Sequence, residues 1–290
     1  MTVRSMEPDL ESFVASDGYR LHLQRWIPPG SELRGRVIVL HGIQSHSGWY
    51  EYSSARMCSA GFEVVFPDRR GSGRNAIDRG HADHQDRLIN DVVQILLTAR
   101  HDTPRVPVTL LGVSWGGKLA AVIAARRPEL VDRLGLLYPG ICPRIRPRWY
   151  QVLMLSLVLR LGMRRRLVDL PLNDAALFTD EPAWREWIEN DPHVLRSATL
   201  SFVTASRALD RLVMLHSESI SCPCLLMLAG RDRIADNIRV RAFFSRVRSS
   251  DRKIIEYAAA RHTLEFEPNR AQIFDDLIAW LSRPCAGVMD

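Results

Sequence analysis

The sequence predicts an α/β fold in which helices cover both faces of a mostly parallel sheet and a helical cap is inserted in the second half. Three observations lead to this prediction. Short apolar runs rich in Val, Ile and Leu recur along the chain, as in strands that are buried on both faces. Longer segments with helical spacing alternate with these runs. One stretch, 141–221, breaks the alternation.

The expected strands follow one another in a regular order. The first alternates polar and apolar residues, and most later ones are continuous apolar runs. The strands are 21–26, 37–40, 62–66, 108–111, 134–138, 224–229 and 253–257. The helices are 50–59, 86–99, 115–126, 237–247 and 271–281. Because ligands bind beyond the carboxyl ends of the strands in such sheets, we expect a site at that edge.

The length of 290 residues allows two domains, or one large domain with an insertion. Residues 141–221 contain no strand-like run, and prolines divide them into short helical segments. The stretch is too long for a loop and too rich in Leu, Trp and Val for disorder. We therefore expect a core built from residues 1–140 and 222–290, with 141–221 as a helical cap.

The net charge is +6 with a pI near 9.4, so a nucleic acid or an anionic membrane has to be considered as a partner. Lys118 and Lys253 are the only lysines, and the other basic residues are arginines. The Arg-rich stretch contains no nucleic-acid-binding module and no interleaved aromatic platform. We therefore exclude a nucleic-acid partner.

Five cysteines in a chain of this length lack the density of a disulfide scaffold. The N-terminal segment has no apolar core of the kind a signal peptide needs. No apolar run reaches the roughly 18 residues of a membrane-spanning helix. These features favour a cytoplasmic location.

A candidate nucleophile lies in the segment Gly112-Val113-Ser114-Trp115-Gly116, between an expected strand and an expected helix. A strand, G-x-S-x-G and a helix in this order form a nucleophile elbow, which holds the serine hydroxyl clear of the backbone. Glycines at 112 and 116 remove the Cβ atoms that would collide as strand and helix approach each other. The start of the helix directs amide groups at charge that develops beside Ser114.

A serine hydroxyl needs a base to take its proton and an acid to orient that base. In the order typical of this elbow, the acid and then the histidine follow later in the chain, each just after a strand. Asp232 follows the strand 224–229, and His262 follows the strand 253–257. The rival acids Asp236 and Asp251 and the rival base His216 do not come directly after a strand end.

An oxyanion hole needs two backbone amides that point at the tetrahedral oxygen. Trp115 N–H is one candidate because it follows the nucleophile. The loop after the strand 37–40 should supply the second, and we assign it to Ile43, with Gln44 as the alternative. We expect His41 to shape this loop.

These motifs, in this order, resemble the α/β-hydrolase superfamily. They are His41-Gly42, the segment 67–73 (PDRRGSG), the Ser114 elbow, Gly230-Arg231-Asp232-Arg233 and His262. Within it, the segment 41–57 (HGIQSHSGWYEYSSARM) is similar to the monoacylglycerol lipase and lysophospholipase group. The resemblance implies an α/β-hydrolase fold and hydrolysis of an acyl ester through an acyl-enzyme, with Ser114, Asp232 and His262 as the triad.

Two departures affect the expected substrate. Val113 and Trp115 stand where the lipases more often carry His and Met, and an indole beside the nucleophile should reshape the acyl pocket. A Trp after the serine is also similar to the prolyl iminopeptidase branch. Such an aminopeptidase would need carboxylates in the cap to hold a free amine, and the candidates are Glu181, Glu186, Glu189 and Asp191. A catalytically silent binding protein on this fold is the other alternative.

The first part of the cap carries seven arginines around an apolar body. From this body we assign Trp149 and Leu153 to substrate binding. A basic helix with an apolar body can lie on an anionic membrane, so we consider peripheral membrane contact beside a solvated basic face. The polar segment 81–86 fits no metal-ligand spacing, and we expect neither a metal nor a cofactor.

Overall fold

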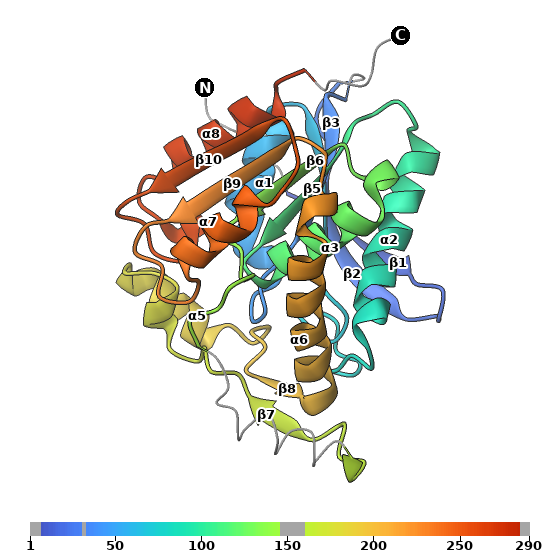
Figure 1. The fold of residues 1–290 in the computed structure, drawn as a ribbon, viewed down its shortest axis with the longest axis vertical. Helices are drawn as coiled ribbons and strands as arrows, with labels where there is room; N and C mark the ends of the chain where they lie inside the picture. The colour runs from blue at the N-terminus through green and yellow to red at the C-terminus, as the bar shows by residue number, and fades with distance from the viewer. Residues whose placement is uncertain (1–6, 31–32, 146–159, 285–290) are drawn as a thin grey trace.

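The computed structural model describes residues 7–30, 33–145 and 160–284. Its centre is an eight-stranded sheet with the order β1-β2-β4-β3-β5-β6-β9-β10 (Figure 1). The strands are β1 (Asp9–Val14), β2 (Arg20–Trp26), β3 (Gly35–Leu40), β4 (Phe62–Pro67), β5 (Val108–Val113), β6 (Arg133–Leu137), β9 (Cys224–Ala229) and β10 (Arg252–Tyr257). From β4 to β10 neighbouring strands are parallel, whereas β1–β2 and β2–β4 are antiparallel. The predicted mostly parallel sheet is confirmed.

Burial explains the composition of the central strands. Every residue of β3, β4, β5, β6 and β9 is buried, so both faces of these strands favour apolar, mostly branched side chains. The edge strand β1 differs because nearly all of its residues are exposed. Its sequence lacks the patterns that predict strands, and the sequence reasoning missed it.

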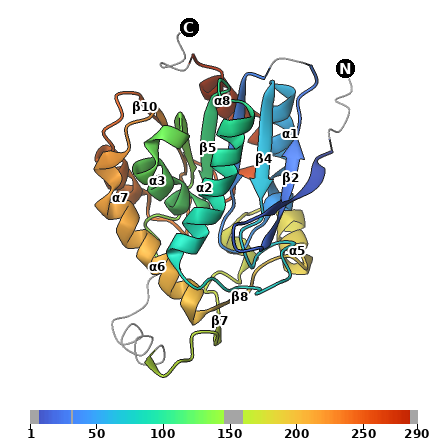
Figure 2. The ribbon, with the colours of Figure 1, turned by 90° about the vertical axis from the view of Figure 1, so that its right-hand side faces the viewer.

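Helices lie on both faces of the sheet, as Figure 2 shows. The helices α2 (Gln85–Asp102), α3 (Trp115–Arg126), α6 (Leu200–Leu215) and α7 (Asn237–Ser245) lie on one side. The helices α1 (Glu51–Ser59) and α8 (Arg270–Leu281) lie on the other. Short 3-10 turns occur at Ser47–Tyr50, Pro128–Leu130, Ala175–Leu177, Ser217–Ser219 and Leu264–Phe266.

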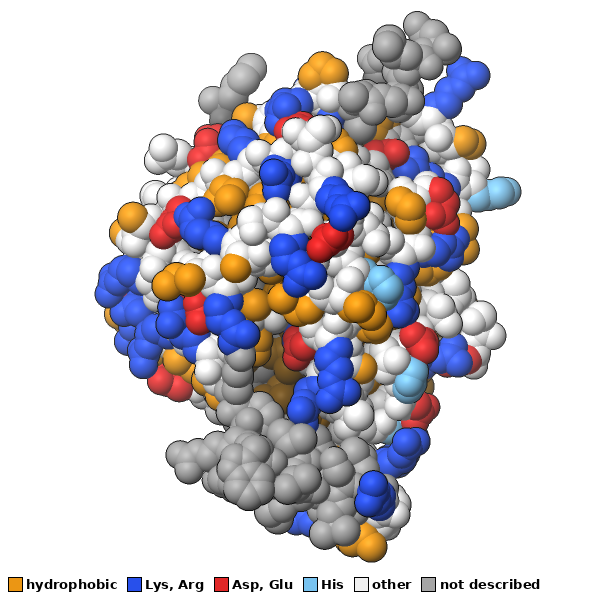
Figure 3. All heavy atoms as spheres, in the orientation of Figure 1, with side chains coloured by type: hydrophobic (Ala, Val, Ile, Leu, Met, Phe, Trp, Pro, Cys, Tyr) orange, Lys and Arg blue, Asp and Glu red, His pale blue; other side chains and the backbone are white. Residues whose placement is uncertain are grey.

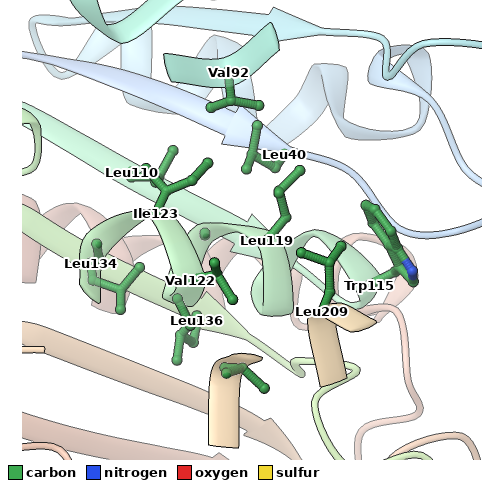
Figure 4. Packing of buried hydrophobic residues seen from close by; sticks show 14 of the residues in the cluster. Leu40, Val92, Leu110, Trp115, Leu119, Val122, Ile123, Leu134, Leu136 and Leu209 are labelled. Atoms are coloured by element: carbon green, nitrogen blue, oxygen red, sulfur yellow. The ribbon is translucent and has the colours of Figure 1, made fainter. Parts of the chain in front are cut away.

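The helix α3 lies at the centre of the first layer (Figure 4). Its side chains Leu119, Val122 and Ile123 are buried against the sheet, with Leu110 of β5 and Leu136 of β6 among the neighbours in the same cluster. This close packing fixes the start of α3 at the carboxyl end of β5.

The segment between β6 and β9 contains α5 (Pro182–Asn190), α6 and two short strands, β7 (Leu167–Asp169) and β8 (Ser197–Thr199). The two strands pair antiparallel, so the expectation that this segment contains no strand was wrong. Three residues are too few to produce a readable pattern. Leu195 N donates to Gln44 O, and Thr263 N donates to Phe178 O, both at 2.9 Å. The segment therefore touches the loops that follow β3 and β10, at the carboxyl edge of the sheet. Its treatment as a separate cap stays a prediction.

Among the helices within the described ranges, none combines the length and the hydropathy needed to cross a bilayer.

Candidate active site

Ser114 lies at the sharp turn between β5 and α3. Its backbone has φ 49° and ψ −119°, a region that residues other than glycine rarely adopt. Hydrogen bonds on both sides hold the turn: Ser114 N donates to Leu137 O at 3.0 Å, and Gly140 N donates to Ser114 O at 2.7 Å. The side chain is therefore held in one place beyond the end of the strand.

Glycines allow the backbones around this turn to approach each other. A Cβ on Gly116 would lie 2.1 Å from Leu40 O, and a Cβ on Gly112 would lie 2.6 Å from Gly117 Cα. A Cβ on Gly42 would lie 3.7 Å from Ser114 Oγ. The first two distances are too short for any side chain, which agrees with the role that the sequence assigned to these glycines. The third places the loop after β3 directly against the serine.

The structure brings Ser114, His262 and Asp232 together in one row. Ser114 Oγ donates to His262 Nε2 at 2.8 Å, and His262 Nδ1 donates to Asp232 Oδ2 at 2.7 Å. The three side chains follow β5, β9 and β10, which meet at the carboxyl edge of the sheet. The edges of the Tyr138 and Phe178 rings pack near the imidazole, with centroids 5.0 and 6.1 Å away.

The carboxylate of Asp232 is stabilised in its charged form. Its Oδ1 accepts hydrogen bonds from the amides of Ile234 at 2.7 Å and Ala235 at 2.9 Å. Burial raises the pKa of Asp232, whereas the interaction with His262 and the hydrogen bonds from these two amides lower it. The lowering effects together are larger, so the pKa is below its usual value. A charged Asp232 can hold His262 in the tautomer whose Nε2 accepts the serine proton.

The two residues expected to supply the oxyanion-hole amides lie near the serine. Ile43 and Trp115 both line the cavity that contains Ser114. Within the described ranges, neither amide donates to a protein acceptor. His41 is buried and shapes the loop as expected: its Nδ1 donates to Gly42 O and its Nε2 accepts from Arg69 N. Burial lowers the pKa of His41 to about 3, so the ring is neutral.

Arg69 connects both sides of this region, a role that its place in the segment 67–73 does not reveal. Its guanidinium donates to Gly42 O at 3.0 Å and to Ile43 O at 2.8 Å. The same group lies 4.7 Å from the ring of Trp115 and 5.0 Å from the ring of Phe202. Arg69 thus fixes the peptide groups after β3 relative to the indole that follows the serine.

Ser114 opens into a cavity of about 200 Å³ between the sheet edge and the segment after β6. Figure 3 shows a hollow with a hydrophobic floor on this side of the molecule. The described walls are mainly apolar and include Leu170, Leu172, Phe202, Val203 and Ile234. Trp115 forms part of the wall, as the sequence suggested. Trp149 and Leu153, which we assigned to substrate binding, lie outside the described residues.

A family model described as serine aminopeptidase, S33 (Hydrolase_4), matches residues 31–269. The chain belongs to this α/β-hydrolase family. The monoacylglycerol lipase of Mycolicibacterium smegmatis is 24% identical over 93% of this chain and 95% of its own length. The monoglyceride lipase of Homo sapiens is 24% identical over 96% of this chain and 92% of its own length.

The fold agrees with these relatives. A structure of a soluble variant of monoglyceride lipase from Saccharomyces cerevisiae, in complex with a substrate analog, matches with a TM-score of 0.84. It has 19% sequence identity and covers 97% of both chains. The predicted α/β-hydrolase fold and the resemblance to the monoacylglycerol lipase group are confirmed, and the chain is a carboxylic ester hydrolase of the lipase and esterase type.

A buried polar contact joins the segment after β6 to the loop after β3. Asp191 Oδ2 accepts from His46 Nε2 and from Trp49 Nε1, both at 2.8 Å. Burial raises the pKa of Asp191, but these bonds outweigh it and lower the pKa to about 2. The partners are more than 140 residues apart in sequence, so no local pattern predicts the contact.

Glu265 is a second buried acid near the site, three residues after His262. Its Oε1 accepts from Ser53 N at 2.9 Å, in the first turn of α1. Its Oε2 has no hydrogen-bond partner in the part of the chain that the structure describes. Burial raises the pKa of Glu265 to about 7. This carboxyl is therefore protonated over much of the acidic range.

His81, in the segment 81–86, makes contacts that hold this loop in place. His81 contacts Thr199 Oγ1 at 3.0 Å and Asp83 Oδ1 at 2.8 Å, which ties this loop to β8. Across residues 7–30, 33–145 and 160–284, no three His, Cys, Asp or Glu side chains form a group that could hold a metal ion.

Proposed function

We propose that this chain is a serine hydrolase that cleaves the carboxylic ester of a monoacylglycerol- or lysophospholipid-like lipid. The hydrogen-bonded row of Ser114, His262 and Asp232, opening into an apolar cavity, carries this proposal. The names of the relatives support the substrate class, and the apolar walls favour a medium or long acyl chain.

In the proposed reaction Ser114 Oγ attacks the ester carbonyl while His262 Nε2 takes its proton. The amides of Ile43 and Trp115 stabilise the negative oxygen of the tetrahedral intermediate. His262 then returns the proton to the leaving alcohol, and an acyl-enzyme forms on Ser114. A water molecule, deprotonated by His262, attacks the acyl-enzyme. The bond from the acyl carbon to Ser114 Oγ then breaks, His262 returns the proton to Ser114 Oγ, and the acid is released. Asp232 holds the imidazole in place and stabilises its charged form.

The position of the acids in the cap argues against an aminopeptidase. Such an enzyme needs a free carboxylate in the cavity to bind the amine of its substrate. None of the four candidates, Glu181, Glu186, Glu189 and Asp191, is among the described residues that line the cavity. Asp191 is already bonded to His46 and Trp49. The hydrogen bonds that join Ser114, His262 and Asp232 argue against a catalytically silent binding protein, because they are the contacts that activate a nucleophile.

Peripheral membrane contact is part of the proposal. Arg160, Arg164 and Arg166 are exposed, and the exposed side chains of Leu161 and Met163 lie between them in sequence. Alternating cations and apolar side chains suit the surface of an anionic bilayer. We expect sedimentation with vesicles that contain phosphatidylserine, lost at high salt, and none with phosphatidylcholine alone. We further propose a cytoplasmic location, which fractionation of cells would test.

The serine assignment is tested by Ser114→Ala. The variant should lose more than about 1,000-fold of the turnover of p-nitrophenyl esters and all labelling by a fluorophosphonate probe. Ser245→Ala, an exposed serine on α7, is the matched control and should keep both. Labelling of Ser114→Ala at the wild-type level would contradict the assignment. Cleavage of proline amides without cleavage of esters would favour the aminopeptidase.

A further inference from the structure

One end of the Ser114 cavity is polar, and the proposed reaction does not use it. Lys118 of α3 and Ser206, Arg207 and Asp210 of α6 line this end, whereas the other described walls are mainly apolar. Lys118 is one of two lysines in the chain, and its side chain is only 4% exposed. Its Nζ donates to Asp210 Oδ1. We call Lys118, Arg207 and Asp210 the charged end of the cavity.

The charges at this end do not balance. Lys118 and Asp210 form an ion pair, so their charges cancel. The half-buried guanidinium of Arg207 adds a second positive charge. Within the described ranges, Arg207 has no ion pair or hydrogen bond. Residues 146–159, which lie outside the described ranges, include no Asp or Glu in their sequence. Burial raises the pKa of Asp210, and the charges of Lys118 and Arg207 oppose that rise. One positive charge is therefore left over.

A cation without a counter-charge raises the free energy of the folded protein when apolar side chains displace water from around it. An anion that enters the cavity would complete the charge balance. A guanidinium binds carboxylate and phosphate groups with two parallel hydrogen bonds, which makes these groups the best-matched anions.

The charged end lies close to the reacting serine. Lys118 comes one helical turn after Ser114, a rise of about 6 Å along α3. On α6, Val203, Arg207 and Asp210 are four and three residues apart, so they share the face that lines the cavity. A substrate whose carbonyl lies at Ser114 can therefore reach Arg207 with a group a few bonds away.

We propose that Arg207, supported by the Lys118–Asp210 pair, binds an anionic group of the substrate, a carboxylate or a phosphate. This inference rests on the proposed ester hydrolysis at Ser114 and narrows its substrates to esters that carry an anionic group. Arg207 is then a specificity-determining residue and takes no part in bond breaking.

The test compares pairs of esters that differ only in charge. In the first pair, p-nitrophenyl esters of equal acyl length end in a methyl group or in a carboxylate. In the second pair, a short-chain monoacylglycerol is compared with its 3-phosphate. We expect kcat/KM to favour the anionic member of at least one pair by about 10- to 100-fold, the range of a charge-assisted hydrogen bond. The first pair reports an anion on the acyl side and the second an anion on the alcohol side.

Arg207→Gln should remove this preference, because it lowers kcat/KM for the anionic ester far more than for the neutral one. Arg211→Gln, an exposed arginine one residue beyond Asp210 on the same helix, carries the same charge change and should keep the preference. Equal or better turnover of both neutral esters by the wild type would overturn the proposal, and so would an equal loss for both members in Arg207→Gln. Fluorophosphonate labelling reads Ser114 separately, so failure of the hydrolase assignment is distinguishable from failure of this one.

Discussion

The buried acid Glu265 predicts an unusual dependence of stability on pH. Its side chain is 1% exposed, and burial raises its pKa from 4.5 to about 7. In the unfolded chain the carboxyl loses its proton near pH 4.5, whereas the folded protein keeps it until about pH 7. Between these values the folded state binds more protons, so the contribution of Glu265 to the free energy of unfolding falls as the pH rises. Above about pH 7 it stays constant.

The size of this effect follows from the two pKa values. A difference of one in pKa corresponds to about 1.4 kcal/mol. Integrated from pH 5 to pH 8, the change from 4.5 to about 7 lowers the free energy of unfolding by roughly 2 to 3 kcal/mol. Glu265→Gln removes the ionisation and keeps the shape. The pH-dependent loss that comes from this one carboxyl should therefore disappear.

Urea unfolding at pH 5 and pH 8 measures the effect. The free energy of unfolding of the variant relative to wild type should rise by roughly 2 to 3 kcal/mol from pH 5 to pH 8. A constant cost of the buried amide cancels in this comparison. Glu189→Gln, an exposed acid on α5, is the control and should show no such rise. If Glu265→Gln follows the wild-type profile, Glu265 is ionised in the folded protein and the reasoning is wrong.

Two further substitutions test the construction of the site. Gly116→Ala places a Cβ 2.1 Å from Leu40 O and should lower the free energy of unfolding in urea by more than about 3 kcal/mol. Gly162→Ala places a Cβ that meets no atom of the described residues within 4 Å, and it should cost about 1 kcal/mol because Gly162 has a positive φ. Similar midpoints for the two variants would contradict the packing argument. Arg69→Met should lower kcat for a neutral ester by roughly 10- to 100-fold with little change in KM, because the amides after β3 lose their support. A rise in KM with kcat unchanged would instead make Arg69 a binding residue.

Patterns along the chain were sufficient for the central sheet and for the residues that follow its strands. A strand buried on both faces is a run of apolar residues, and the loop directly after it contains the functional side chain. Ser114, Asp232 and His262 could therefore be proposed together, and the structure brings them within hydrogen-bonding distance.

The remaining features depend on contacts that no local pattern records. The exposed strand β1 forms because its backbone pairs with β2, whatever its side chains are. Arg69 looks like any loop arginine until its contacts with Gly42 and Ile43 are known. Likewise, Lys118, Arg207 and Asp210 come together only because α3 packs against α6 in the folded chain.

The separation of the reacting groups along the chain has a consequence for folding. His262 lies 148 residues after Ser114 and follows β10, a strand at the edge of the sheet. The turn at Ser114 can form from neighbouring residues, but His262 reaches the serine only after β10 has docked beside β9. Contacts of such long range form slowly and late. The rate at which Ser114 becomes reactive toward a fluorophosphonate during refolding should therefore report when β10 docks. A partly folded chain should contain the serine at its turn but lack the histidine that activates it.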